Sequence, residues 1–391
     1  MCDLMNILLL TQFLSVTKGG GEYVFSVMAE ALAKRGHNVW IITHRVENED
    51  YTNFHKNVRI HFVSPIKYEG GLPPSFKDNI KFTLQAIFSG LQIIKKENID
   101  LIHSNNFSPA LAGAILSNLT SKPHVTTVHD VFSLCGKNYW QKWGKQSNIS
   151  RLSVLLAPFF EKMMIRLKHS AIHTVSEATR DDLIKFGARK PIYVIPNTIK
   201  INKAEEMELL PFQFVYLGRL VFYKNLEVII KAIQIAKKSF PDITLIIAGD
   251  GPHRENLERL VNNLKLQDNI KFVGFVTEKE KMKLLSSSQA LVFPSLCEGF
   301  GLVILESFSC SRPVIVSNVR PLSDIIDDKK DGLIIESTDE NGWADAMTYF
   351  ILNQANSLEM GKAGKKKLES IYNQEITINK VESMYKEVIL S

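Results

Sequence analysis

The chain has 391 residues, of which 45% are hydrophobic and 23% are charged, and its formal net charge is +6. This composition is typical of a soluble globular enzyme and excludes the disordered and fibrous classes. The length exceeds what one hydrophobic core usually supports, so we expect two domains. No apolar run reaches the roughly eighteen residues of a transmembrane helix, and the run at Ile7–Leu10 lacks the cationic flank of a signal peptide.

The first half of the chain alternates short β-branched runs with amphipathic segments. We predict a strand at 7–11, a helix at 23–35 that Gly36 ends, and a second strand at 39–43, which together make a βαβ unit. Further strands are expected at 59–63, 101–104, 125–129, 171–175 and 193–195. Further helices are expected at 80–96, 109–118, 152–168 and 177–186.

Positive charge is concentrated in this half. Residues 1–200 contain 24 Lys and Arg against 15 Asp and Glu, whereas the remainder contains 23 against 26. Within residues 134–170, aromatic and methionine side chains are interleaved with basic ones. The basic residues are Lys137, Lys142, Lys145, Arg151, Lys162, Arg166 and Lys168. Such a mixture suits an anionic membrane surface or nucleic acid, but a helix with one buried and one solvated face explains it equally well.

The second half repeats the alternation after residues 198–212, a segment without a periodic apolar face that we interpret as a linker. Strands are expected at 214–217, 244–248, 270–273, 291–293, 314–317 and 333–335. Helices are expected at 226–238, 254–264, 279–287, 303–308 and 342–352. We therefore predict an α/β fold of two Rossmann-like, doubly wound domains, residues 1–198 and 199–374, that face each other across a cleft.

The four cysteines favour a reducing compartment. Cys2, Cys135, Cys297 and Cys310 are scattered, with neither the spacing of a metal site nor the density of a disulfide framework. We therefore predict free thiols and a cytoplasmic protein.

Three loops at predicted strand ends offer backbone or positive charge to a ligand. Gly19-Gly20-Gly21-Glu22 lets the backbone approach an anion, but it matches neither the dinucleotide fingerprint nor a Walker loop. Gly218-Arg219-Leu220, followed by Lys224-Asn225, supplies two cations suited to a diphosphate. Gly249-Asp250-Gly251-Pro252 is most simply a tight turn.

The fourth loop, residues 294–301, carries Glu298, and the helix after it carries Glu306. Two carboxylates would repel a diphosphate, but both can accept hydrogen bonds from hydroxyls. Glu306 would suit a vicinal diol and Glu298 a sugar ring, which points to a sugar nucleotide. Without the surrounding sequence motif, Glu306 would be interpreted as an ordinary solvated charge on a helix.

Together these motifs resemble a known family. GGGE (19–22), HD (129–130), SE (176–177), GRL…KN (218–225), AGDGP (248–252) and E-x7-E (298–306) occur in the sequence in this order. Their order and spacing are similar to those of the retaining glycosyltransferases of family 4, over essentially the whole chain. The resemblance implies the GT-B fold and a C-terminal helix, within 375–391, that packs back on the first domain.

The resemblance also implies roles for the matched residues. Arg219 and Lys224 would neutralise the diphosphate leaving group. His129 would lie by the transferred sugar, Glu298 would contact that sugar, and Glu306 would bind the ribose hydroxyls. The other donor-binding positions would be Gly20, Gly21, Gly218, Gly249, Phe300, Gly301 and Leu302. From the residues alone, His129 is more simply a satisfied core histidine.

From this resemblance we expect transfer of a hexose or N-acetylhexosamine from a UDP- or GDP-linked donor to a glycan or polyprenyl-linked acceptor. The basic segment 134–170 would bring the protein to the inner, cytoplasmic membrane face, and no nucleic acid or cofactor is expected. No metal is expected either, because no Asp-x-Asp lies at a strand end.

Several alternatives stay open at this point. Same-face attack would give retention without a side-chain base, and double displacement with Glu298 as nucleophile is its rival. A sugar-nucleotide epimerase of the same fold and a non-catalytic sugar-nucleotide-binding protein are alternative functions.

Overall fold

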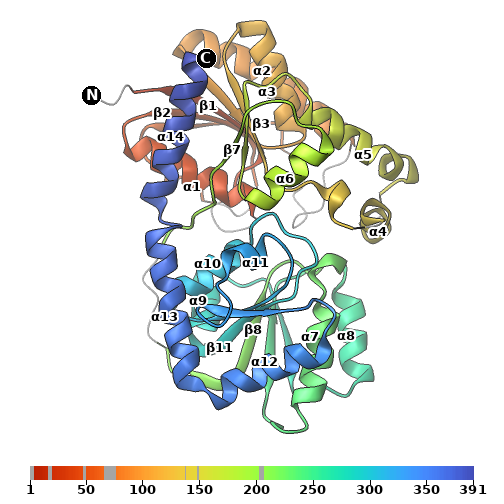
Figure 1. Cartoon of the computed structure of the whole chain (residues 1–391). Helices are drawn as coiled ribbons and strands as arrows, with labels where there is room; N and C mark the ends of the chain where they lie inside the picture. Colours follow the sequence, from red (N-terminus) through yellow and green to blue (C-terminus); the bar gives the residue numbers. More distant parts are fainter. Residues whose placement is uncertain are drawn as a thin grey trace. The chain divides into compact units, whose positions relative to one another are not determined.

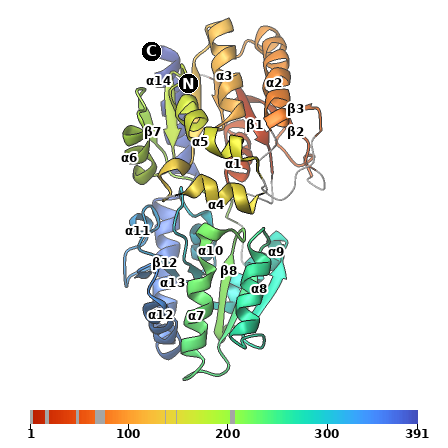
Figure 2. The ribbon, with the colours of Figure 1, turned by 90° about the vertical axis from the view of Figure 1, so that its right-hand side faces the viewer.

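The computed structural model describes residues 4–15, 20–46, 50–65, 76–136, 138–147, 149–201 and 207–391. The chain divides into two compact units, whose elements can be followed in Figures 1 and 2. The first unit comprises Met1–Leu134, Arg151–Thr198 and Gln374–Ser391, and the second comprises Cys135–Ser150 and Ile199–Asn373. Residues 135–150, which we predicted to belong to the first domain, thus group with the second unit.

A parallel sheet of seven strands forms the centre of the first unit, in the order β3-β2-β1-β4-β5-β6-β7. The strands are β1 (Asn6–Phe13), β2 (Asn38–His44), β3 (Val58–Val63), β4 (Leu101–Ser104), β5 (His124–Val128), β6 (Ala171–Thr174) and β7 (Ile192–Val194). The strand order reverses between β1 and β4. The carboxyl ends of these two strands are therefore the topological switch point, where doubly wound folds bind ligands.

Helices cover both faces of this sheet. They are α1 (Gly21–Lys34), α2 (Phe76–Glu97), α3 (Ser108–Thr120), α5 (Arg151–Ile165), α6 (Glu177–Phe186) and α14 (Gln374–Leu390), with the short η1 (Phe132–Leu134). Successive residues of a strand point to opposite faces. Ile7 and Leu9 of β1 accordingly lie in one core with α1 and α14, whereas Leu8 and Leu10 lie in another with α2 and α3.

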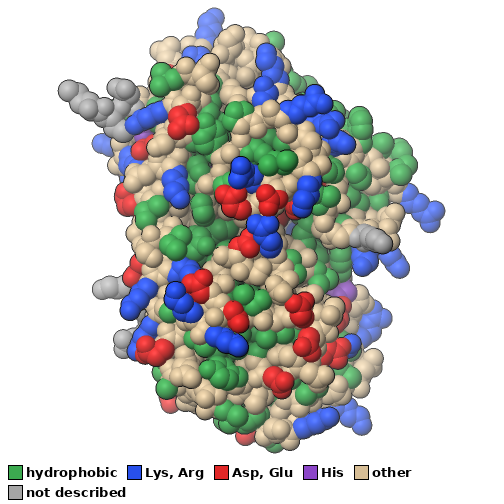
Figure 3. Space-filling view, in the orientation of Figure 1, with side chains coloured by type: hydrophobic (Ala, Val, Ile, Leu, Met, Phe, Trp, Pro, Cys, Tyr) green, Lys and Arg blue, Asp and Glu red, His purple; other side chains and the backbone are tan. Residues whose placement is uncertain are grey.

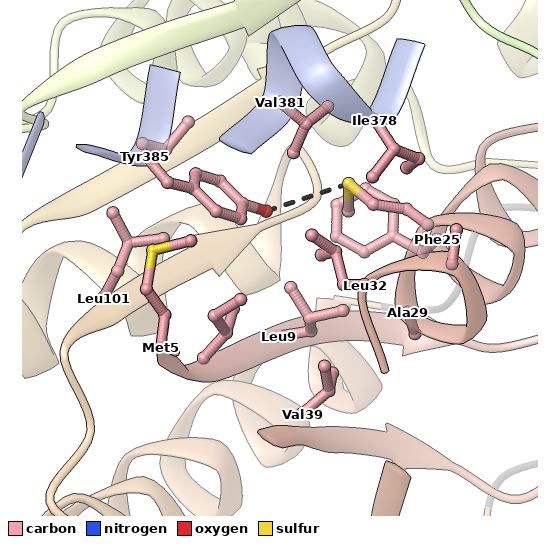
Figure 4. Close-up of a cluster of buried hydrophobic side chains, with 14 of the residues drawn as sticks. Met5, Leu9, Phe25, Ala29, Leu32, Val39, Leu101, Ile378, Val381 and Tyr385 are labelled. Carbon is pink, nitrogen blue, oxygen red and sulfur yellow. Dashed lines mark hydrogen bonds between the residues drawn. The ribbon is translucent and has the colours of Figure 1, made fainter. Parts of the chain in front are cut away.

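The C-terminal helix α14 is held in the first unit by apolar and ionic contacts. Val381 and Tyr385 point from α14 into the core that contains Leu9 (Figure 4). At the edge of this core, Arg35 Nη1 donates to Glu382 Oε2 at 3.0 Å. Residues far apart in the sequence thus complete one core.

A parallel sheet of six strands forms the centre of the second unit, in the order β10-β9-β8-β11-β12-β13. The strands are β8 (Leu210–Leu217), β9 (Thr244–Ala248), β10 (Ile270–Gly274), β11 (Ser288–Phe293), β12 (Val314–Ser317) and β13 (Gly332–Ile335). The helices are α4 (Tyr139–Gln146), η2 (Phe222–Lys224), α7 (Leu226–Ala236), α8 (Arg254–Asn263), α9 (Glu278–Ser287), α10 (Leu302–Ser309), α11 (Leu322–Ile325), α12 (Glu340–Leu352) and α13 (Gln354–Ser370). Here the strand order reverses between β8 and β11.

Four elements differ from the sequence-based expectation. Strand β8 begins at Leu210, inside the predicted linker, of which residues 202–206 lie outside the described part. Helices α4, α11 and α13 were not predicted. Glycine lowers the helix propensity of α13, yet a Cβ on Gly361 would lie 2.0 Å from Ser311 O, so packing requires this glycine.

The prediction of free thiols was wrong for two cysteines. Cys135 and Cys297 form a disulfide with a Cα–Cα distance of 5.5 Å, across a sequence separation of 162 residues. Cys310 is a free thiol, and Cys2 lies outside the described residues. Within the ranges that the structure describes, no helix is long and apolar enough to cross a bilayer.

Candidate active site

In the first unit, the glycine-rich motif and the HD motif meet at the switch point. Gly21 is the first residue of α1, which follows β1, and His129 follows β5. A Cβ on Gly21 would lie 2.9 Å from His129 Nε2 and 3.4 Å from Asn105 Nδ2, so only glycine allows this approach. A Cβ on Gly20 would meet nothing within 4 Å. Gly19 lies outside the described residues.

His129 is not a satisfied core histidine. Its Nε2 is buried, and no described residue hydrogen-bonds to it. Burial, followed by the nearby His173, lowers the pKa of His129 to about 3, so the imidazole is neutral at pH 7. A buried polar atom without a protein partner calls for an explanation, and a ligand hydroxyl beside Gly21 would supply one.

Two neighbouring histidines are fully hydrogen-bonded, as expected for structural residues. His173 Nε2 lies 3.1 Å from Ile195 O, so it carries the hydrogen, and His173 Nδ1 accepts from Thr127 Oγ1 at 2.9 Å. Thr127 Oγ1 must then accept from His103 Nε2 at 2.7 Å, and His103 Nδ1 accepts from Tyr385 Oη at 2.5 Å. The Ile195 carbonyl at one end thus fixes the position of every proton in this hydrogen-bonded series.

In the second unit, the loops after β8 and β9 interlock through their backbones. Gly218 N donates to Ala248 O at 3.1 Å, and Leu220 N donates to Asp250 O at 2.9 Å. Gly249 has a φ of +136°, and a Cβ there would lie 2.0 Å from Gly218 O. Gly249 is therefore required by the close approach of the two loops, and its predicted contact with the donor stays a prediction.

Arg219 and Lys224, in the loop after β8, have different partners. Arg219 Cζ lies 5.0 Å from the centroid of the Trp143 ring. Lys224 Nζ forms a salt bridge with Glu298, in which each side chain is 12% exposed, and lies 4.8 Å from the Phe293 ring centroid. The structure thus brings Lys224 and Glu298 into direct contact, which the motifs did not indicate.

The loop that carries Glu298 is fixed by residues next to Lys224. Tyr223 O accepts from Leu296 N at 2.8 Å. The Asn225 side chain donates to Pro294 O of this loop at 3.3 Å and to Ser337 O, after β13, at 2.7 Å. The lysine and the glutamate therefore share one rigid support.

This loop ends at the N-terminus of α10. Gly301 precedes the helix in a left-handed conformation, with a φ of +92°, and Leu302 is the first helical residue. The Phe300 side chain is buried and packs on Tyr372, with 5.7 Å between ring centroids. Its backbone, together with the first N–H groups of α10, is left to face an anion.

Glu306 does not stand alone in α10. Its Oε1 lies 2.6 Å from Lys281 Nζ, which also lies 2.7 Å from Glu278 Oε1. The side chains of Glu306 and Lys281 are each 17% exposed. Burial raises the pKa of Glu306, and Lys281 opposes that rise. Lys281 therefore both fixes one carboxylate oxygen and favours the ionised form.

Lys281 and Trp143 are site residues that the sequence analysis missed. Lys281 lies in a correctly predicted helix, but no motif links it to Glu306, 25 residues further along the chain. Trp143 is one of the aromatic residues interleaved with basic ones in 134–170, and no motif distinguishes it from the others. Both are identified by contacts between elements, which spacing in the sequence does not record.

Over the described residues, no group of three or more His, Cys, Asp or Glu could hold a metal ion. Asp327 and Asp331, which lie close together, both pair with Lys367.

Comparison with known proteins gives two family matches in succession. The model described as Glycosyltransferase Family 4 matches residues 18–203, and that of the Glycosyl transferases group 1 matches residues 198–367. The alpha-monoglucosyldiacylglycerol synthase of Streptococcus pneumoniae is 26% identical over 326 residues, which cover 78% of this chain and 69% of that protein.

Solved structures share the fold of the whole chain. The sucrose-phosphate synthase of Thermosynechococcus elongatus has a TM-score of 0.82 at 21% identity, with 99% of each chain covered. Anabaena HepE in complex with UDP-glucose has a TM-score of 0.75 at 18% identity, with 98% of this chain and 99% of that chain covered. With two Rossmann-like parallel sheets and adjoining family matches from residue 18 to residue 367, the chain belongs to the group 1 glycosyltransferases and has the GT-B fold.

Proposed function

We propose that this protein transfers a hexose or N-acetylhexosamine from a UDP- or GDP-linked sugar to a glycan or lipid-linked acceptor. The observation that carries the proposal is the grouping of Arg219, Lys224 and the N-terminus of α10 at the switch point of the second unit. Two cations and a helix N-terminus suit a diphosphate. The solved relative from Anabaena holds UDP-glucose. We propose that the reaction uses no cofactor besides the nucleotide sugar.

The nucleoside would be held by Glu306. An ionised carboxylate accepts two O–H donors from a vicinal diol, such as that of ribose. Because Lys281 fixes Glu306 Oε1 and opposes its protonation, the carboxylate is oriented before the donor binds. Preorganisation of this kind lowers the entropic cost of binding.

The chemical step would be driven by electrostatics. Breaking the anomeric C–O bond leaves negative charge on the diphosphate and positive charge on the sugar. Arg219, Lys224 and the α10 N-terminus would stabilise the leaving group without reorganising. The leaving phosphate oxygen would then take the acceptor proton on the same face, which gives retention. Since protein cations supply the positive charge, we propose a metal-independent reaction.

Glu298 has a binding role in this same-face route, whereas the rival double displacement would use its second carboxylate oxygen as the nucleophile. Glu298 Oε1 accepts both from Lys224 Nζ and from Ser295 Oγ, the latter at 2.9 Å. We propose that Glu298 contacts a sugar hydroxyl and holds Lys224 beside the diphosphate.

In the first unit, His129 would lie by the transferred sugar, and its neutral imidazole can hydrogen-bond a hydroxyl of that sugar. Val128 and Asp130, on either side of His129 in the sequence, line a small pocket where we place the acceptor. Phe107, Val128 and Met164 give it apolar walls, and Asp130 and Glu161 add carboxylates. Such a lining suits an acceptor with both apolar and hydroxyl groups.

We further propose that the first unit meets the anionic inner face of the membrane, as a peripheral protein of the cytoplasm. On α5, Leu155 and Phe159 are 76% and 64% exposed, and Arg151 and Lys162 are exposed beside them. Figure 3 shows apolar side chains gathered over α5, with Lys or Arg nearby. Apolar residues flanked by cations suit an anionic lipid surface. The Streptococcus relative is named for a glucosylated diacylglycerol.

A similar surface lies on α2. Its exposed residues are apolar or basic apart from one glutamine, and they include no acid. They are Lys77, Ile80, Lys81, Leu84, Phe88, Leu91, Gln92, Lys95 and Lys96. The membrane surface proposed for residues 134–170 is therefore narrowed to α5 and extended to α2, because Tyr139 and Trp143 of α4 are buried.

The transfer function is tested by measuring release of UDP or GDP from a panel of nucleotide sugars. In Lys224→Ala, we expect turnover to fall about 100-fold or more, because the leaving group loses a preorganised cation. Lys231→Ala, which removes an exposed cation of α7, is the control. The double variant Lys224→Met/Glu298→Gln separates loss of the cation from an unpaired carboxylate. Wild-type turnover in Lys224→Ala would refute the leaving-group role.

The membrane proposal is tested by flotation with phosphatidylglycerol/phosphatidylcholine vesicles at low salt. Leu155→Glu and Phe159→Glu should abolish flotation, and so should high salt. Leu352→Glu, which changes a leucine that is 67% exposed on α12, should float like the wild type. Failure of the wild type to float at low salt would remove the membrane proposal and leave the transfer function untouched.

A further inference from the structure

The segment 135–150 contains α4 and belongs to the second unit, although its neighbours in sequence belong to the first. Three kinds of contact hold it there. Cys135 is disulfide-bonded to Cys297, the residue before Glu298. Gln146 Oε1 accepts from Phe222 N at 3.3 Å, at the start of η2. The third contact is aromatic.

The aromatic contact buries two side chains of α4. The Tyr139 ring lies 5.6 Å from that of Phe222 and 5.7 Å from that of Tyr223, between centroids. Trp143 lies 6.2 Å from Tyr223. Phe222 and Tyr223 directly precede Lys224. The segment therefore covers the η2 turn from which one proposed diphosphate ligand projects.

The other diphosphate ligand is in contact with α4 itself. Arg219 Cζ lies 5.0 Å from the Trp143 ring centroid. No hydrogen bond or ion pair of the Arg219 side chain occurs among the described residues. A guanidinium is planar, and stacking on an indole restricts the direction in which its N–H groups point. Trp143 is thus the contact that orients Arg219.

We propose that Trp143 is a positioning residue for Arg219, and that the segment 135–150 orders the diphosphate site. The inference rests on the proposed function, because it concerns the same leaving group. Trp143 itself does not touch the substrate in this arrangement. Its effect should therefore appear in binding of the diphosphate and not in binding of the nucleoside.

The disulfide makes this positioning depend on the thiol state. A dithiol can transfer two electrons and two protons to the Cys135 and Cys297 sulfurs, which breaks the S–S bond, while the dithiol closes to its own cyclic disulfide. Reduction would free the start of the segment from the loop of Glu298. We expect the reduced protein to hold Arg219 less firmly.

The test is calorimetric titration with UDP and GDP, each compared with its monophosphate. Trp143→Leu should weaken binding of the preferred diphosphate about tenfold, the effect of losing a partly desolvated cation–π contact. Its affinity for the monophosphate should stay within about twofold. Trp143→Phe should recover part of the loss, and Trp140→Leu, on the same helix, should match the wild type. A merely structural role would weaken both ligands alike and would refute the positioning.

A double-mutant cycle keeps the test decisive if Trp143→Leu is less stable. In an Arg219→Ala background, Trp143→Leu should cause no further loss of diphosphate affinity. Additive losses would overturn the inference.

The part of the disulfide is tested with Cys135→Ser. This variant should bind the diphosphate as weakly as wild type treated with dithiothreitol, and dithiothreitol should not weaken its binding further. If Cys135→Ser binds like the oxidised wild type, the disulfide has no part in positioning.

The two proposals fail in different ways. If wild type binds neither diphosphate more tightly than its monophosphate, the diphosphate site is refuted, and the positioning of Arg219 with it. If wild type prefers the diphosphate and Trp143→Leu keeps that preference, the positioning alone is refuted.

Discussion

Removing Lys281 should separate the two effects that this residue has on Glu306. The perturbation is Lys281→Met, which keeps the aliphatic stem and deletes the ammonium that lies 2.6 Å from Glu306 Oε1. Lys283→Met, two residues further along α9, removes an exposed lysine and is the matched control. We expect Lys281→Met to lower both the stability of the second unit and its affinity for the nucleotide.

The size of the stability loss follows from burial. Breaking a fully buried ion pair costs about 3–5 kcal/mol, but both side chains of this pair are 17% exposed. Solvent screening reduces the cost to about 2 kcal/mol, which for a unit of this size lowers Tm by about 4–8 °C.

The two losses should depend on pH in opposite directions. Burial already raises the pKa of Glu306, and loss of Lys281 should raise it further. A folded-state pKa above the unfolded value means that ionisation destabilises the fold, so the stability deficit grows as pH rises above about 4.5. A protonated Glu306 accepts weaker hydrogen bonds from ribose. The affinity deficit should therefore be greatest at low pH and shrink as pH rises.

Thermal melts and calorimetric titrations with UDP and GDP, at intervals from pH 5 to pH 8, measure both trends. Lys283→Met should follow the wild type in each. Equal Tm values for Lys281→Met and wild type at pH 8, or a deficit in affinity that does not change with pH, would refute the role given to Lys281.

Three further predictions concern stability. Gly249→Ala should destabilise the second unit by about 3 kcal/mol, because its Cβ would lie 2.0 Å from Gly218 O, whereas Gly20→Ala should have no such effect in a thermal melt. Tyr385→Phe should cost about 1–3 kcal/mol by leaving His103 Nδ1 without its donor, and an unchanged urea midpoint would contradict the proton order deduced above. The stability of the first unit should fall by about 1.4 kcal/mol per pH unit for each of three buried histidines as pH drops from 6.5 towards 4, because these stay neutral when folded and are protonated when unfolded. They are His129, with a pKa of about 3, and His169 and His173, with pKa values of about 4. Urea midpoints that do not change between pH 7 and pH 5 would contradict this last prediction.

The fold could be predicted because its signal is local. Strand β1 alternates Ile7 and Leu9 with Leu8 and Leu10 between two cores, and every residue of this run is buried. Runs of this kind, separated by amphipathic helices, specify a parallel sheet with helices on both faces. The same reasoning missed α4, a helix of eight residues whose Tyr139 and Trp143 are buried by the second unit and not by their sequence neighbours.

Only those residues of the candidate site that belong to sequence motifs could be predicted. Arg219, Lys224 and Glu298 were named from their types, their places in loops and the family resemblance, and Glu306 from its place in the helix that follows one of these loops. Their partners were not predicted, because a salt bridge between α9 and α10 does not change the periodic pattern of apolar residues in either helix. The cysteines show the same limit, since Cys135 and Cys297 are 162 residues apart and only the folded chain brings them together.

These partners answer an objection that the sequence itself raised, namely that two carboxylates would repel a diphosphate. Glu298 is paired with Lys224, and Glu306 is paired with Lys281. Each negative charge is therefore compensated next to it, and neither dominates the field at the site. In the described part of the chain, the Arg219 guanidinium has an aromatic neighbour and no carboxylate partner. Its charge therefore remains available to the diphosphate, together with the N–H groups at the start of α10.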